Sequence, residues 1–316
     1  MNQRVRKLRA KSIKTKPYIS PERATLITKF YNSAIISQGS IPVQRALAFK
    51  YLLENKKICI NDGELIVGER GPALKAVPTY PEICCHSLQD LEILDSREKT
   101  AYAVDEETKK VYKAKIIPFW KGKSIRDIIF DKMSLEWKAG YEAGVFTEFL
   151  EQRAPGHTVL DNKIYGKGMV DFKKDIKRSM RNLDFLNDPE AYGKMEELKA
   201  MEIAADAIMG YAKRHAKKAK ELRRKEKNPE RKKELAKIVD VCSHVPAYAP
   251  RDFWEALQYY WFVHIGVITE LNPWDSFNPG RLDQHLYPFC KKGLADGTLT
   301  ESNGLSSVIT PTWTNQ

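Results

Sequence analysis

The chain has 316 residues, of which 42% are hydrophobic and 30% are charged, and its formal net charge is +12. This length allows one large domain or two ordinary ones with a sizeable core, and the composition excludes a disordered protein. Residues 1–17 lack the apolar stretch of a signal peptide, and the longest apolar run, at 261–268, is too short to span a bilayer. We therefore expect a cytoplasmic protein with no membrane partner.

The positive charge is concentrated in two segments. Residues 1–17 carry +7 and residues 213–233 carry +9, so the rest of the chain carries −4. We predict a flexible basic N-terminus over 1–19 and a solvated helical hairpin around 213–233. A surface that faces RNA or lipid is the functional alternative, but neither segment contains the aromatic residues on which bases stack, so nucleic acid is disfavoured.

The cysteines do not form a recognisable metal or disulfide pattern. Their number is odd, their spacing is irregular and none belongs to a CxxC pair. Adjacent ligands such as those at 84–86 chelate one tetrahedral ion poorly. We therefore predict structural thiols and no metal site. The cysteines are Cys59, Cys84, Cys85, Cys242 and Cys290.

Local signals predict several elements in the first half of the chain. Ser20 followed by Pro21 and Glu22 is a typical helix start. In the segment 57–69, two short β-prone runs flank Asn61-Asp62-Gly63, which is typical of a turn between strands. Further helices are predicted near 43–53, 86–94, 122–133 and 135–150.

The second half reads as long helices. In the segment 190–242, helical spacing places one set of apolar residues on one face, and Asn228-Pro229 divides the segment into a hairpin. The methionines of this stretch are predicted to fill the core rather than to bind a ligand. Another helix is predicted over 251–266. The residues of the predicted face are Leu198, Met201, Ala205, Ile208 and Ala212.

Two irregular loops carry groups that can handle protons. His157 follows Pro155-Gly156, a step that ends a helix and forces a turn. Asp275 lies between two Asn-Pro steps, beside apolar residues that can raise its pKa by desolvation. Together they could protonate a departing substrate hydroxyl, with Phe149 as an apolar wall. The structural alternatives are a hydrogen-bonded loop histidine and an aspartate that caps a turn.

Several stretches resemble the N-terminal part of the pyruvate formate-lyase-like glycyl radical enzymes. They are NDGELIVGERG, PTYPEICCH, TEFLEQRAPGHTV, DFLND and YWFVHIGVITELNPWDSFNPGRLDQHLYPF. Within that family they are most similar to members that dehydrate trans-4-hydroxy-L-proline. The resemblance covers roughly residues 20–300, and the third and last stretches carry most of its specificity.

This resemblance implies an α-rich α/β fold, in which the chain supplies a helical shell and the first elements of an incomplete ten-stranded barrel. It implies a hydroxyproline-like small-molecule substrate, and it places Phe149, His157 and Asp275 around the substrate. It also implies a glycyl radical installed by an S-adenosylmethionine and iron–sulfur activating enzyme, with no cofactor bound directly, and a homodimer in the full-length form.

The chain departs from the family pattern in two ways. It contains neither the family's catalytic cysteine, by sequence context, nor its radical glycine loop, and residues 301–316 diverge from the family. We therefore expect an N-terminal fragment of a dehydratase that is inactive alone, with a tail produced by truncation or frameshift. The alternatives are a fragment of a glycerol or diol dehydratase, a fragment of a formate acetyltransferase, and a basic helical binding protein without enzymatic activity.

Overall fold

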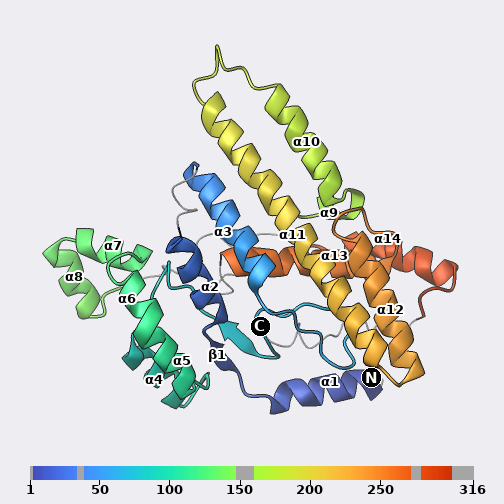
Figure 1. Cartoon of the computed structure of the whole chain (residues 1–316), viewed down its shortest axis with the longest axis horizontal. Helices are drawn as coiled ribbons and strands as arrows, with labels where there is room; N and C mark the ends of the chain where they lie inside the picture. Colours follow the sequence, from blue (N-terminus) through green and yellow to red (C-terminus); the bar gives the residue numbers. More distant parts are fainter. Residues whose placement is uncertain (1–2, 34–38, 147–159, 272–278, 301–316) are drawn as a thin grey trace.

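The computed structural model describes residues 3–33, 39–146, 160–271 and 279–300, and helices dominate this part of the chain (Figure 1). The long helix α11 crosses the whole molecule, and α13 lies across it near the centre (Figure 1). The elements are α1 (Gln3–Lys14), β1 (Tyr18–Ser20), α2 (Glu22–Tyr31), α3 (Ile41–Asn55), β2 (Ala76–Pro78), α4 (Leu88–Ser96), α5 (Glu106–Val111), η2 (Tyr112–Ile116), α6 (Ile117–Trp120), α7 (Ile125–Lys132), α8 (Leu135–Glu142), α9 (Lys163–Gly166), α10 (Met169–Arg181), α11 (Ala191–Lys225), α12 (Pro229–His244), α13 (Phe253–Glu270) and α14 (Leu282–Ala295).

Most of the basic N-terminus, for which the sequence suggested a flexible segment over 1–19, forms the helix α1. Val5 and Leu8 share one face of α1 and are only 2% and 5% exposed, so the helix docks on the body of the protein. The chain then forms β1, which pairs in parallel with β2, with Tyr18 opposite Ala76. The predicted divergent tail, 301–316, lies outside the described residues.

Two helix starts follow the local signals in the sequence. The hydroxyl of Ser20 accepts a hydrogen bond from the backbone N–H of Glu22 at 3.4 Å, at the start of α2. The side-chain oxygen of Asn228 accepts bonds from the backbone N–H groups of Glu230 at 2.9 Å and Arg231 at 3.1 Å. These bonds satisfy donors that the first turn of a helix leaves free, so both predictions are confirmed.

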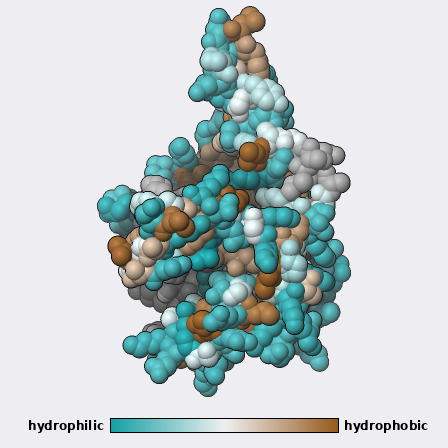
Figure 2. Space-filling model, turned by 90° about the vertical axis from the view of Figure 1, so that its left-hand side faces the viewer, coloured by the Kyte–Doolittle hydropathy of each residue, from teal (hydrophilic) through white to brown (hydrophobic). Residues whose placement is uncertain are grey.

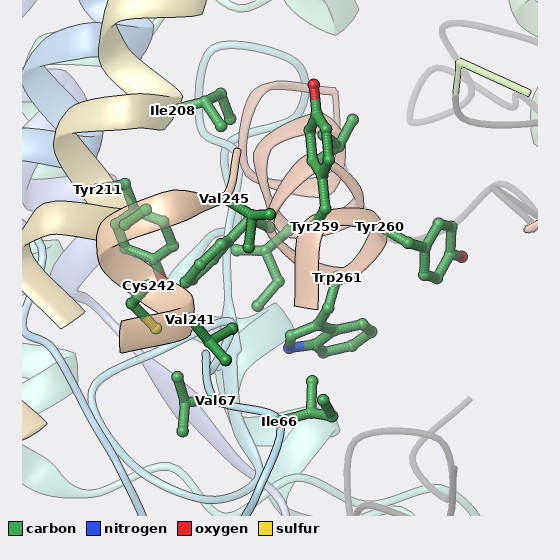
Figure 3. Packing of buried hydrophobic residues seen from close by; sticks show 14 of the residues in the cluster. Ile66, Val67, Ile208, Tyr211, Val241, Cys242, Val245, Tyr259, Tyr260 and Trp261 are labelled. Carbon is green, nitrogen blue, oxygen red and sulfur yellow. The ribbon is translucent and has the colours of Figure 1, made fainter. Parts of the chain in front are cut away.

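The main core lies where α11, α12 and α13 meet, with contributions from α3 (Figure 3). Small residues let these helices approach closely: a Cβ on Gly266 of α13 would lie 2.3 Å from Cδ1 of Ile208 on α11. Ala205, Ile208 and Ala212 are buried as predicted. Met201 is 54% exposed, so its prediction as core filler is wrong. A second cluster joins α2 and α3 to η2 and α6.

The segment 57–69 contains the predicted turn but not the strands suggested by its β-prone runs. Gly63 has φ +82°, a conformation that favours glycine. The backbone after the turn is paired by side chains of α13 instead of a neighbouring strand. Gln258 accepts a bond from the N–H of Val67 and donates one to its carbonyl, both at 2.8 Å.

Two tryptophans of α13 extend this pairing. The indole N–H of Trp254 donates to the carbonyl of Leu65 at 3.1 Å, and that of Trp261 donates to the carbonyl of Gly68 at 2.9 Å. Trp254, Gln258 and Trp261 are spaced so that they share one helix face. One face of α13 therefore satisfies the buried backbone of residues 65–68, which buried polar groups require.

Within the described residues, every helix is too short or too polar to cross a bilayer.

The Gln258 contact predicts a large stability effect. Gln258→Met keeps the side-chain length but leaves the buried N–H and carbonyl of Val67 without partners. We expect a loss of about 2–4 kcal/mol in the free energy of unfolding, measured by urea denaturation. The matched control Gln284→Met, at an exposed position of α14, should change it by less than about 0.5 kcal/mol. Equal effects of the two variants would contradict this role of Gln258.

Candidate active site

The three residues predicted to form the site, Phe149, His157 and Asp275, all lie outside the described residues. The segments that contain them are 147–159 and 272–278, and the structure describes the residues on either side of each. We therefore describe the candidate active site through the elements that flank these two segments, which include α9, α13 and α14.

A described contact joins the parts of the chain that follow the two segments. Asp161 comes shortly after the first segment, and His285 lies in α14, which follows the second. Their side chains form a contact of 3.3 Å between Nε2 of His285 and Oδ1 of Asp161. The ring of His285 also lies 5.4 Å from the ring of Tyr165 in α9. This contact joins α9 to α14 and brings together two parts of the chain that are more than 100 residues apart in sequence.

The end of the first segment is fixed by α9 and by the helix behind it. Ile164 is fully buried, and the hydroxyl of Tyr259 on α13 donates to the carbonyl of Lys167 at 3.2 Å. Leu160 and Asp161 have φ values of +55° and +48°. This left-handed conformation costs non-glycine residues about 1 kcal/mol each, so the packing of α9 must hold it in place.

The second segment starts from the C-terminal end of α13, which three side chains hold. The guanidinium of Arg23 donates to the carbonyl of Thr269 at 2.7 Å, and the hydroxyl of Tyr80 donates to the carbonyl of Ile268. Arg45 pairs with Glu270, the last residue of α13. Positive groups are favourable at this end of a helix because its unpaired carbonyls carry partial negative charge.

Arg23 is itself held in a buried arrangement. It pairs with the carboxylate of Glu82, including a bond of 3.2 Å from Nη1 to Oε2, and its guanidinium lies 3.8 Å from the centre of the Tyr80 ring. Burial disfavours its charge, but the adjacent Glu82 more than offsets this, so the pKa of Arg23 lies above its ordinary value. The α13 terminus is therefore anchored by a permanently charged group.

Tyr260 belongs to the main core cluster and lies one turn of α13 before His264, and both side chains are buried. Tyr260 points away from Tyr211 and Cys242, which lie in the main core (Figure 3). Its hydroxyl lies 3.2 Å from Nδ1 of His264. Burial, with a further contribution from Arg70, lowers the pKa of His264 to about 4. His264 is therefore neutral at pH 7 and acts there as a hydrogen-bonding group without charge.

Titratable groups also cluster in the segment 57–69, which the sequence did not mark as chemically active. The amide nitrogen of Asn61 donates to Glu64 at 2.8 Å and to Glu69 at 2.9 Å, and both carboxyl groups are buried. Burial, with repulsion from Glu64, raises the pKa of Glu69 to about 8. The buried ammonium of Lys56 donates to the carbonyls of Glu69 and Arg70. Every partner here belongs to the protein, so the cluster fastens the segment to α3.

The cysteines of this region are not reactive. Burial raises the pKa of Cys59 to about 11 and that of Cys85 to about 12, and it raises that of the fully buried Cys242 further still. These three thiols are therefore protonated at neutral pH. Among the described residues, no group of three or more His, Cys, Asp or Glu side chains is placed to hold a metal ion.

The raised pKa of Glu69 predicts how stability depends on pH. The folded protein holds the proton on Glu69 more tightly than the unfolded chain does. The stabilisation that this proton provides is therefore complete below pH 4.5 and is lost as pH rises to about 8. We expect Glu69→Gln to remove a loss of up to about 5 kcal/mol in the free energy of unfolding across this range, measured by urea denaturation at each pH. The control Glu54→Gln, at an exposed position of α3, should keep the slope. An unchanged slope in Glu69→Gln would rule out this origin.

The sequence matches a known family. The profile described as pyruvate formate lyase-like matches residues 1–306. The trans-4-hydroxy-L-proline dehydratase of Clostridioides difficile is 52% identical over 299 residues, which make up 94% of this chain and 38% of that protein. The isethionate sulfite-lyase of Nitratidesulfovibrio vulgaris is 32% identical over 302 residues, which make up 92% of this chain and 36% of that protein.

The fold agrees with the sequence. The crystal structure of the Clostridioides difficile hydroxyproline dehydratase with trans-4-hydroxy-L-proline bound matches with a TM-score of 0.93 at 50% identity, covering 98% of this chain and 39% of that chain. This chain thus spans less than two fifths of the length of these relatives. The prediction of a helix-rich N-terminal portion of a larger glycyl radical enzyme fold is confirmed. The chain belongs to the pyruvate formate lyase-like family.

Proposed function

We propose that this chain is the N-terminal portion of a glycyl radical dehydratase whose complete form removes water from trans-4-hydroxy-L-proline to give a pyrroline-5-carboxylate. The observation that carries this proposal is the contrast in identity: 52% to a hydroxyproline dehydratase against 32% to a sulfite-lyase of the same family. A shared substrate accounts for this contrast better than a shared fold, because both relatives match the same part of the chain.

The radical chemistry is supplied by parts of the family fold that this chain does not span. An activating enzyme of the S-adenosylmethionine type would install the glycyl radical, which supplies hydrogen-atom abstraction at C5 of the substrate. None of Cys59, Cys84, Cys85, Cys242 and Cys290 stands in the sequence context of the family's reacting cysteine. We place that cysteine, the radical glycine and the contacts of a homodimer outside these residues.

His157 and Asp275 handle the proton of the departing hydroxyl in this proposal. Loss of the C4 hydroxyl as water needs one proton, and loss of the ring N–H proton as the C=N bond forms restores the proton balance. The hydrogen atom removed from C5 is returned to C4, so the overall change is loss of water alone. Phe149 supplies an apolar wall that keeps water from the reacting carbon. The contact between Asp161 and His285 supports this assignment, because it holds together the ends of the two segments that carry the acid groups.

The anchors of α13 also support the proposal. A general acid must be held within hydrogen-bond reach of the atom it serves. Arg23, Tyr80 and Arg45 fix the end of α13 from which the Asp275 segment starts, and Tyr259 fixes the backbone beyond α9. Helix α13 thus contacts the backbone after α9 and carries the starting point of the Asp275 segment, which suits a site that requires a fixed distance between two proton-handling groups.

The reaction can be tested in a full-length chimera. Residues 20–300 would replace the matching region of the Clostridioides difficile dehydratase, and the product would be followed after activation in the absence of oxygen. We expect dehydration of trans-4-hydroxy-L-proline, and we expect His157→Gln and Asp275→Asn to lower kcat by about 10²–10⁴-fold. Phe149→Ala should raise KM as well as lower kcat.

The control in this chimera is His86→Gln, which changes a histidine outside the two segments and should leave kcat within twofold. If all three site variants keep full activity, these residues do not have the proposed roles. If the activated chimera dehydrates glycerol or propane-1,2-diol but not hydroxyproline, the substrate assignment is wrong while the dehydratase assignment stands.

The proposal also predicts how the isolated chain behaves. A fragment leaves apolar surface that the rest of the fold would cover, and α7 and α8 contain no buried residue. Figure 2 views the molecule from this side and shows apolar patches there and at the tip between α10 and α11. Leu135 and Trp137 are 80% and 61% exposed. Surfaces of this kind promote association.

We therefore expect the isolated chain to self-associate in analytical ultracentrifugation. The double variant Leu135→Gln/Trp137→Lys should reduce the associated fraction severalfold, because it removes apolar area and adds charge. The control Lys121→Gln/Lys138→Gln alters polar positions in and near the same helices and should not reduce it. A monomeric chain with a single sharp thermal transition would contradict the prediction, because it would show that the exposed apolar surface does not cause association.

A further inference from the structure

The fold brings together the two basic segments that the sequence separates by about 200 residues. Helix α1 lies beneath the turn between α11 and α12 (Figure 1). Arg4 of α1 pairs with Glu234 of α12. Between the two helices, Leu8 packs near Gly63, and Arg231 donates to the carbonyl of Glu64 at 2.8 Å. The N-terminus and the hairpin therefore form one surface, which we call the basic surface.

Most cations of the basic surface have no acidic partner. The internal contacts use Arg4, Arg214 and Arg231, whose guanidinium groups bind Glu234 or backbone carbonyls. Lys233 pairs with Glu230 at 2.9 Å. Fourteen other exposed cations have no ion pair in the part of the chain that the structure describes. They are Arg6, Lys7, Arg9, Lys11, Lys14 and Lys16 near α1, and Lys213, Lys217, Lys220, Arg223, Arg224, Lys225, Lys227 and Lys232 in the hairpin.

The unpaired positive charges lower the stability of the chain alone and favour binding of an anionic partner. Like charges on neighbouring helices repel one another, and the two segments carry +7 and +9 while the rest of the chain carries −4. All of these cations except Lys16 and Lys227 also lie on helices. A partner of opposite charge would relieve the repulsion with little ordering of this chain.

The surroundings of the cations indicate which kind of anion fits. A membrane fits poorly, because Val5 and Leu8 are buried in the protein and leave Ile13 as the single large apolar side chain that α1 exposes, too little area to insert stably into lipid. A nucleic acid also fits less well, since the two segments contain no aromatic residue for stacking. Asp62 and Glu230 are exposed by 92% and 76% within the surface and would repel a continuous row of phosphates.

We infer that the basic surface is a docking site for an acidic face of another protein. Such a face carries mostly carboxylates but can place a lysine or arginine opposite Asp62 and Glu230. Ile13, which is 69% exposed on α1, offers an apolar contact of the kind found inside protein interfaces. This inference is independent of the proposed dehydratase chemistry, because it involves neither of the segments assigned to the active site.

The test uses the 316-residue chain and two labelled probes, poly-L-glutamate and a DNA duplex of equal charge. Binding is measured by fluorescence anisotropy at several salt concentrations. We expect poly-L-glutamate to bind at least as tightly as the duplex, with an affinity that falls as salt rises. Two triple variants remove charge from each half of the surface: Arg6→Glu/Lys7→Glu/Lys14→Glu on α1, and Lys217→Glu/Lys220→Glu/Arg224→Glu on α11.

Each triple variant should weaken poly-L-glutamate binding by about tenfold or more. The control Lys110→Glu/Lys113→Glu/Lys115→Glu makes the same change in net charge at exposed positions around η2 and should stay within twofold. Glutamate is a good helix former, and circular dichroism would verify the fold of each variant. An equal loss of affinity in the control would show that binding depends on net charge and not on the basic surface. Tighter binding of the duplex than of poly-L-glutamate would indicate a nucleic acid partner instead of a protein. Either result would overturn the inference.

Discussion

The pairing between α13 and the extended backbone of residues 65–68 is the contact on which the rest of the structure depends. A buried segment outside a sheet must find partners for its N–H and carbonyl groups, and here three side chains of one helix provide them. Because Gln258 and the two tryptophans fix the rotation of α13, they also fix where its other faces point. Tyr259 then meets the backbone beyond α9, and Tyr260 points away from Tyr211 and Cys242.

The same helix links the core to the proposed chemistry. Its C-terminal carbonyls are bound by Arg23 and Tyr80, so the segment that contains Asp275 starts from a fixed point. The contact between His285 and Asp161 fixes the other side of the proposed site. These two sets of contacts fix the described residues on either side of the segment that contains Asp275.

The charged groups fall into two classes with different roles. Buried ones such as Arg23, Lys56 and Glu69 bind backbone carbonyls or neighbouring side chains and hold segments together, and burial shifts their pKa values. Exposed lysines and arginines of α1 and the hairpin have no such partners and form the basic surface. Composition alone reports only their sum, so the net charge of +12 does not distinguish an internal anchor from a docking surface.

The sequence by itself determined the features that depend on neighbouring residues. The helix starts at Ser20 and Asn228 and the turn at Gly63 follow from local hydrogen bonds and backbone freedom. The motifs around Phe149, His157 and Asp275 pointed to the family, but their positions lie outside the described residues. Only the tertiary structure decided that the runs around Gly63 pair with α13 rather than with each other, that α1 docks, that Met201 is exposed and that the two basic segments meet. Each of these depends on contacts between residues far apart in the chain, whose energies no local pattern contains.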